Sequence, residues 1–290
     1  ATDGSRYVAR ICAIRPRGAF NVDFEVALLD HLHAQGVGVA TPVLAANGAA
    51  SVTLPFPEGP RALVLFRHCD GAVPDTPEEL HLTGATLAQI HSAAQSYAGP
   101  ASRYVLDGHH LASRTLDYLA AHPDLAPTVL DAYRQLIERL LSELAEVEGT
   151  LTRVMCHGDT HGFNNHVTTD ADGVQRAAFF DFDDAGPGFL AYDLCVWLWS
   201  NLPRKAPMEP DEALLKRWQQ YLAGYRAGGG HITDADLAAL PLFVQLRHLW
   251  NMGEGVARIH HWGANMMSAD WIKKQLDVMA AWARLELPPG

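Results

Sequence analysis

The segment from residue 156 to 184 constrains the fold of this chain most, because short apolar runs alternate in it with oxygen-bearing side chains. Asp159 and Asn164 follow one apolar run, and Asp181 follows a second. The tetrapeptide Asp-Ala-Asp-Gly at 170–173 predicts a hairpin turn between the runs, since glycine adopts positive φ freely. Two strands joined by this turn would bring the three side chains to one rim, and their oxygen atoms suit Mg²⁺.

Two strings in this segment resemble the motifs of one enzyme superfamily. Residues 157–164 (HGDTHGFN) resemble the H-G-D-x-H-x-x-N motif of the aminoglycoside phosphotransferase and choline kinase superfamily. Residues 180–186 (FDFDDAG), followed by Tyr192-Asp193-Leu194, resemble its I-D-F-x-x-A-x-x-G and D-L-A segment. The resemblance implies an α+β, bilobal protein-kinase-like fold with a small β-rich lobe and a large helical lobe.

The resemblance also assigns roles in phosphoryl transfer. In this chemistry an Asp orients the attacking hydroxyl, while an Asn and a second Asp hold metal on the phosphates. By this correspondence Asp159 and His161 are catalytic, and His161 lies near the transferred phosphate. Asn164 and Asp181 bind Mg²⁺, and Asp193 braces the loop.

Other interpretations of the same residues were weighed. Any one of these carboxylates alone would more often be an ordinary strand-end residue, so the assignment depends on their joint occurrence. His157 and His161 are four residues apart, as in the zinc motif H-E-x-x-H. That motif requires a helix and a Glu in the second position. Gly158 occupies this position and Gly162 follows soon after, so the zinc interpretation is rejected.

Composition limits the class of protein. A hydrophobic content of 48% with 19% charged residues is typical of a globular chain of 290 residues. No apolar run approaches the roughly 20 residues that a bilayer requires. The net charge of −11 argues against nucleic acid or an anionic membrane as a partner. The cysteines are widely spaced and lie in apolar contexts, which predicts reduced thiols in a cytoplasmic protein: Cys12, Cys69, Cys156 and Cys195.

The first quarter of the chain predicts a small β-rich unit. Residues 6–14, 50–54 and 61–67 are expected to be strands, and residues 22–35 a helix. This order resembles the small lobe of a kinase from its third strand onward, with residues 66–71 as the hinge. We therefore expect a partial kinase-like lobe over residues 1–70.

From residue 71 to 290 we expect a helical lobe that carries the catalytic loop and the substrate site. One expected helix, at 234–259, contains Pro241 in its first turns, where it is tolerated or marks a kink. The other expected helices are at 77–97, 111–121, 126–148, 191–201, 211–227 and 269–285.

The small lobe supplies the expected nucleotide site. Arg10 stands where the superfamily has a Lys that holds the phosphates, and Glu25 on the next helix is its expected partner. A routine surface ion pair is the alternative for these two residues. Phe66 and His68 lie in the hinge segment, whose backbone would contact the adenine. No glycine-rich loop precedes residue 6, and Gly18 stands alone, so the small lobe is expected to be N-terminally truncated.

The sequence signal for the phosphate-acceptor site is less specific than that for the catalytic loop. Residues 245–253 (QLRHLWNMG) resemble the helices of homoserine kinase type II, hydroxylysine kinase and the bacterial stress-response kinase. Packing is the alternative for Trp250 and Met252. The expected reaction is the ATP- and Mg²⁺-dependent phosphorylation of a hydroxyl on a small, amine-bearing molecule such as an aminoglycoside, homoserine or a choline-like alcohol. A protein Ser/Thr kinase and a non-catalytic nucleotide-binding pseudokinase are the alternatives.

Overall fold

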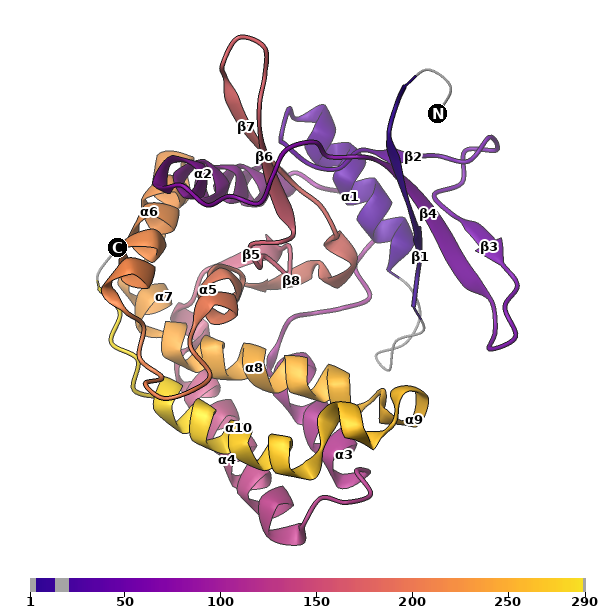
Figure 1. The fold of residues 1–290 in the computed structure, drawn as a ribbon. Helices are drawn as coiled ribbons and strands as arrows, with labels where there is room; N and C mark the ends of the chain where they lie inside the picture. The colour runs from indigo at the N-terminus through magenta and orange to yellow at the C-terminus, as the bar shows by residue number, and fades with distance from the viewer. Residues whose placement is uncertain (1–3, 14–20, 289–290) are drawn as a thin grey trace.

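The structure is a computed structural model that describes residues 4–13 and 21–288 (Figure 1). Its first part is a small antiparallel sheet around the central strand β4, Arg61–Arg67. β4 pairs with β1 (Tyr7–Ile11), β2 (Pro42–Val43) and β3 (Val52–Leu54). Alternate residues of β4 are buried, as expected for a strand with one covered face. Helix α1, Val22–Ala34, lies beside this sheet (Figure 1).

The strands and helices expected in this part are present with small shifts. The expected strand at 6–14 begins one residue later and ends at Ile11. Its last expected residue, and Gly18, lie outside the described residues. The expected helix at 22–35 ends one residue earlier, at Ala34. The division of the chain at residues 70 and 71 stays a prediction.

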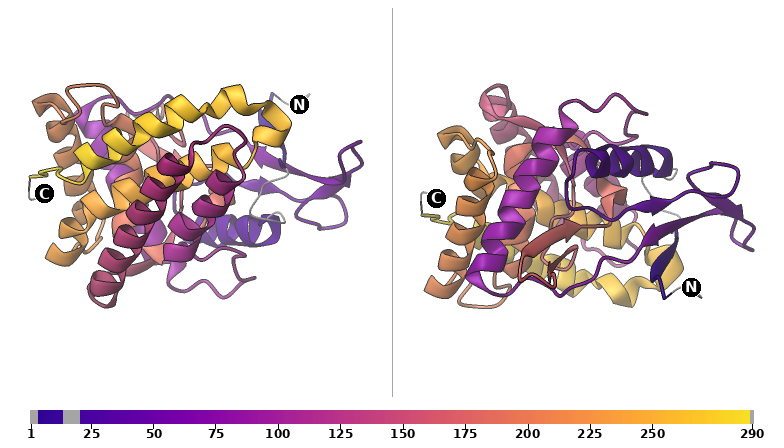
Figure 2. Two further views of the ribbon diagram at one scale, coloured as in Figure 1. Left: turned by 90° about the horizontal axis from the view of Figure 1, so that it is seen from below. Right: turned by 90° about the horizontal axis from the view of Figure 1, so that it is seen from above.

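The larger part of the chain is mainly helical, and in both views of Figure 2 most of its helices lie away from the small sheet, while the yellow C-terminal helices extend toward the N-terminus. Helix α2 begins with a capping box, in which Thr76 and Glu79 satisfy each other's backbone N–H groups. The α-helices are α2 (Pro77–Ala94), α3 (Arg114–Ala120), α4 (Pro127–Val147), α5 (Leu190–Asn201), α6 (Glu212–Ala227), α7 (Asp234–Ala238), α8 (Leu240–Val256), α9 (Ile259–Trp262) and α10 (Ala269–Trp282). Short turns of other helix types are η1 (His109–Ser113), η2 (Glu148–Thr150), η3 (Phe182–Asp184) and η4 (Ala264–Met267).

The expectation of one helix over 234–259 is wrong. The structure divides this stretch into α7, α8 and the short α9. Pro241 lies in the first turn of α8, where its missing N–H donor costs nothing. In a continuous helix the same ring would clash with the carbonyl of residue 237. The proline therefore separates two helices and does not merely bend one.

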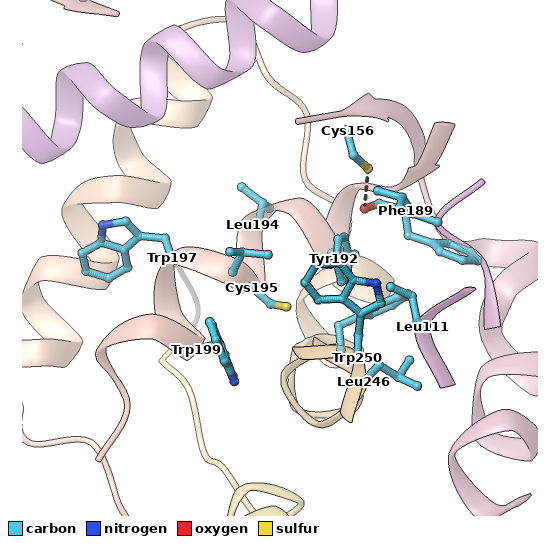
Figure 3. Packing of buried hydrophobic residues seen from close by; sticks show 14 of the residues in the cluster. Leu111, Cys156, Phe189, Tyr192, Leu194, Cys195, Trp197, Trp199, Leu246 and Trp250 are labelled. Atoms are coloured by element: carbon cyan, nitrogen blue, oxygen red, sulfur yellow. Dashed lines mark hydrogen bonds between the residues drawn. The ribbon is translucent and has the colours of Figure 1, made fainter. Parts of the chain in front are cut away.

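Helix α5 runs through the centre of the core. All residues from Leu190 to Trp199 are buried, as expected for a helix that is apolar on all sides apart from Asp193. Trp197 stacks on Trp218 and Tyr221 of α6, with ring centroids 6.0 and 5.3 Å apart. Figure 3 shows the cluster, with the dashed hydrogen bond between the Cys156 thiol and the Phe189 carbonyl. The core thus surrounds the helix that carries Asp193.

Two strand pairs carry the polar segment at residues 156–184. β5 (Arg153–Cys156) pairs with β8 (Gly186–Phe189), and β6 (Asn165–Thr169) pairs with β7 (Gln175–Phe179). The expected hairpin turn joins β6 and β7 and projects from the body of the molecule (Figure 1). A small sheet and a larger helical part are confirmed. Within residues 4–13 and 21–288, no helix is both long and apolar enough to cross a membrane.

Candidate active site

The loop after β5 is anchored by Asp193, which α5 presents from the core. Its carboxylate accepts the backbone N–H groups of His157 and Gly158, each at 2.8 Å. His91 of α2 contacts the same carboxylate at 2.8 Å, and the Thr160 hydroxyl donates to the Asp193 carbonyl at 2.6 Å. Burial alone would raise the pKa of Asp193, but the His91 hydrogen bond and nearby histidines hold it below its usual value. The loop is therefore fixed from behind by a buried anion.

Asp159 projects from this anchored loop with both carboxylate oxygens engaged. The Asn164 amide nitrogen donates to the Asp159 carboxylate at 3.1 Å and to its backbone carbonyl at 2.9 Å. His161 Nε2 lies 3.5 Å from the same carboxylate oxygen. Arg247 of α8 forms an ion pair with the other oxygen. Burial alone would raise the pKa of Asp159, but Arg247, His161 and His157 together lower it.

Asp181 and the small lobe meet through Arg10. Asp181 has a positive φ of 66°, which is rare for a residue other than glycine. Arg10 donates from one nitrogen to Asp181 at 2.8 Å and to Glu25 at 2.9 Å, and pairs with Glu25 through its second nitrogen. The contact expected between Arg10 and Glu25 is thus present, and Glu25 is fully buried. Burial raises the pKa of Glu25 to about 7, although Arg10 opposes the rise.

The donor atoms at this rim fit a divalent cation. The Asn164 amide nitrogen donates to Asp159, and the amide oxygen of the same side chain is an acceptor of the kind that binds a divalent cation. Burial and the nearby Asp183 carboxylate raise the pKa of Asp181, so an added positive charge would be favourable there. Over the described ranges, no three His, Cys, Asp or Glu side chains form a metal cluster. A metal would therefore need further oxygen ligands from a bound molecule.

A pocket of about 310 Å³ opens between the sheet and the β6–β7 hairpin. Arg10 and Asp181 line one end of it, while Phe66 and His68 line the hinge side. Arg10 also lies over the Phe66 ring, 5.2 Å from its centroid. The other lining residues are Val8, Ala9, Ala40, Arg67, Cys69, His166 and Phe180. Of the eight residues named in the sequence analysis for catalysis, nucleotide or metal, four line this pocket and Glu25 pairs with Arg10. The other three, Asp159, His161 and Asn164, contact one another on the loop after β5.

The sequence analysis did not foresee two partners in this site. Arg247 lies within residues 245–253, for which no contact with Asp159 was predicted, and its pairing with Asp159 spans 88 positions of the chain. His91 lies in the helix expected at 77–97, for which no contact was predicted, and it meets Asp193 across 102 positions. The available signal is a charged residue on an otherwise buried helix, since such a group requires a partner.

The sequence comparisons identify relatives over most of the chain. The model of the phosphotransferase enzyme family matches residues 1–231. An uncharacterized protein of Deinococcus radiodurans is 35% identical over 282 residues, which cover 96% of this chain and 79% of that protein. The homoserine kinase of Xanthobacter autotrophicus is 28% identical over 229 residues, which cover 76% of this chain and 64% of the kinase.

Solved structures extend the comparison to the fold. An amicoumacin kinase, solved with AMP-PNP and Ca²⁺, superposes with a TM-score of 0.72 at 21% identity, covering 98% of this chain and 85% of that one. A microcompartment-associated aminopropanol kinase superposes with a TM-score of 0.67 at 25% identity, covering 97% and 84%. Together with the family match, the chain belongs to the phosphotransferase enzyme family of the aminoglycoside phosphotransferase and choline kinase superfamily, with a protein-kinase-like fold and an alcohol group as the phosphate acceptor.

Proposed function

We propose that this protein transfers the γ-phosphate of ATP, with Mg²⁺, to the hydroxyl of a small, amine-bearing alcohol. The observation that carries the proposal is that the catalytic loop and the pocket beside the small sheet lie next to each other. Asp159 lies beside Asn164, while Asp181 connects through Arg10 to the pocket along the hinge. A nucleotide in that pocket would direct its phosphates toward the rim from which Asp159 projects.

Each side chain has a stated role in this proposal. Phe66 and the His68 segment contact the adenine, and Arg10, held by Glu25, contacts the phosphates. Arg can do so through two parallel hydrogen bonds, unlike the point charge of a Lys. Asp159 orients the acceptor hydroxyl and receives its proton late in the transfer, because positioning dominates this chemistry.

The remaining roles belong to the metal ligands and His161. Asn164 and Asp181 would hold Mg²⁺, which, when bound, neutralises charge on the phosphates. His161, 3.5 Å from the Asp159 carboxylate, would face the transferred phosphate. Burial lowers the pKa of His161 despite the nearby Asp159, so the ring acts as a neutral hydrogen-bond donor.

The acceptor class is supported by the names of two relatives. The homoserine kinase and the aminopropanol kinase are each named for a small compound that carries both a hydroxyl and an amino group. The net charge of −11 is compatible with a cationic acceptor. The four cysteines are free thiols, which agrees with a reaction in the cytoplasm. The homoserine kinase branch remains part of this proposal.

The test is ATP consumption with L-homoserine, 1-amino-2-propanol, ethanolamine, choline or kanamycin as the acceptor, compared between the wild type and Asp159→Asn. We expect at least one acceptor to support Mg²⁺-dependent turnover, and the variant to lose roughly 10²- to 10⁴-fold in kcat while still binding Mg·ATP. Asp172→Asn, at the exposed end of the hairpin, is the matched control and should keep wild-type turnover.

Three results would count against the proposal. Unchanged turnover in Asp159→Asn would overturn the role of this residue. Phosphate incorporated into protein, with none transferred to the five compounds, would favour a protein Ser/Thr kinase. Stabilisation by ATP without its consumption would favour a nucleotide-binding pseudokinase.

A further inference from the structure

Arg247 places a permanent positive charge directly behind the active-site rim. Its side chain is 3% exposed, in the cluster formed by α5 and α8. A buried guanidinium is expensive unless it is paired and hydrogen-bonded. The position of this charge, next to the proposed hydroxyl-orienting residue, therefore requires an explanation beyond packing.

Several contacts hold the guanidinium in one orientation. It lies over two indole rings, 4.8 Å from the centroid of Trp199 and 4.5 Å from that of Trp250. One nitrogen donates to the Gly158 carbonyl and to the Tyr192 hydroxyl, both at 3.1 Å. Figure 3 shows Trp199, Tyr192 and Trp250 gathered in this part of the core. Because indole rings pack on the planar guanidinium and hydrogen bonds hold its edge, it has little rotational freedom.

The other terminal nitrogen of Arg247 pairs with one oxygen of Asp159, while its Nε is buried without a hydrogen-bond partner among the described residues. The second oxygen accepts from Asn164 at 3.1 Å. The carboxylate is thus held from two sides, and its plane is set by a rigid cation on α8 and an amide on the catalytic loop. The Asp159 side chain is 18% exposed, so part of the carboxylate remains accessible to an acceptor hydroxyl.

We propose that Arg247 is the positioning residue for Asp159: it fixes the plane of the carboxylate so that one oxygen faces the acceptor hydroxyl. The inference depends on the proposed function, because it assigns Arg247 an effect on turnover that acts through Asp159. A purely structural ion pair would instead hold α8 against the loop and affect stability alone.

The test compares Arg247→Gln, Arg247→Lys and Arg204→Gln, using the compound among the five named above on which the wild type is fastest. Arg247→Gln should lower kcat by roughly 10- to 100-fold, with the KM for ATP within about twofold of wild type. Arg247→Lys keeps the positive charge but lacks the planar set of N–H donors of the guanidinium. Most of the loss in kcat should therefore remain. Arg247→Lys also keeps a cation beside Asp159. If Arg247→Gln does not fold, the inference can still be tested on the Lys variant. Arg204 lies over Trp199 at 4.9 Å without contacting Asp159, so Arg204→Gln should keep wild-type kcat.

A double-mutant cycle then separates positioning from an independent effect. If Arg247 acts through Asp159, adding Arg247→Gln to Asp159→Asn should lower the residual rate by less than about twofold. The same factor of loss in both backgrounds would overturn the inference and leave the proposed function intact. Wild-type kcat in Arg247→Gln, or full rescue by Arg247→Lys, would also overturn it. If Asp159→Asn itself keeps full turnover, the proposed function fails and this inference fails with it.

Discussion

Asp193 is the single charged residue of α5, and the helix buries it completely. Its oxygens receive the N–H groups of His157 and Gly158 and the ring of His91. In Asp193→Asn, an amide NH₂ would face one of these donors. We therefore expect the free energy of unfolding to fall by about 3 kcal/mol, since a buried charged acceptor would be replaced by an unmatched group.

Urea unfolding of the two proteins measures this difference, and turnover should fall with it because the loop carries Asp159. The control is Asp277→Asn, an exposed position on α10, which should change the free energy of unfolding by less than about 0.5 kcal/mol. A loss below 1 kcal/mol in Asp193→Asn would mean that the loop does not depend on this anion.

At the scale of elements, the catalytic loop and the β6–β7 turn each contain a glycine with positive φ. Gly158 has φ +86° and Gly173 has φ +80°. A Cβ atom on Gly158 would lie 2.3 Å from the Asp184 carbonyl oxygen, whereas one on Gly173 would meet nothing within 4 Å. The two positions thus share the backbone strain and differ in the available space.

Gly173→Ala should therefore lower the free energy of unfolding by about 1 kcal/mol, because a positive φ is strained for alanine and no steric clash is added. Gly158→Ala should lose roughly 3 kcal/mol or more and nearly all turnover, because the loop must move away from the Asp184 backbone. Paired urea unfolding and kinetic measurements check both values. Equal effects of the two substitutions would show that the close approach to Asp184 does not matter.

Local signals made these elements predictable from the sequence. The hairpin turn at 170–173 depends on residues that are adjacent in the chain. Thr76, the N-cap of α2, and Pro127, the first residue of α4, are local signals for the start of a helix. The pairing of Arg247 with Asp159 depends on how α8 packs against the catalytic loop, which no local pattern encodes. For this reason the motif residues and the supporting Asp193 were predictable, while the pairing of Arg247 with Asp159 was not.

At the scale of the whole molecule, one buried histidine couples stability to pH. His248 of α8 accepts a hydrogen bond from the Trp199 indole at 3.2 Å and contacts the Gln275 side chain at 3.1 Å. The Trp282 ring of α10 covers it, with the ring centroids 5.0 Å apart. Burial, together with the charge of Arg204, lowers its pKa to about 4. The packing of α5, α8 and α10 thus surrounds a neutral imidazole.

Because the pKa of His248 is lower in the folded protein, the unfolded chain binds an extra proton between about pH 6.5 and pH 4. Stability from this group is complete above pH 6.5 and is lost as the pH falls, by on the order of 3 kcal/mol at pH 4. His248→Gln keeps an acceptor and a donor but does not titrate, so its urea midpoint should fall less over this range. His231→Gln, at an exposed position, should follow the wild type. If the wild type and His248→Gln lose stability in parallel, the acid sensitivity lies elsewhere in the molecule.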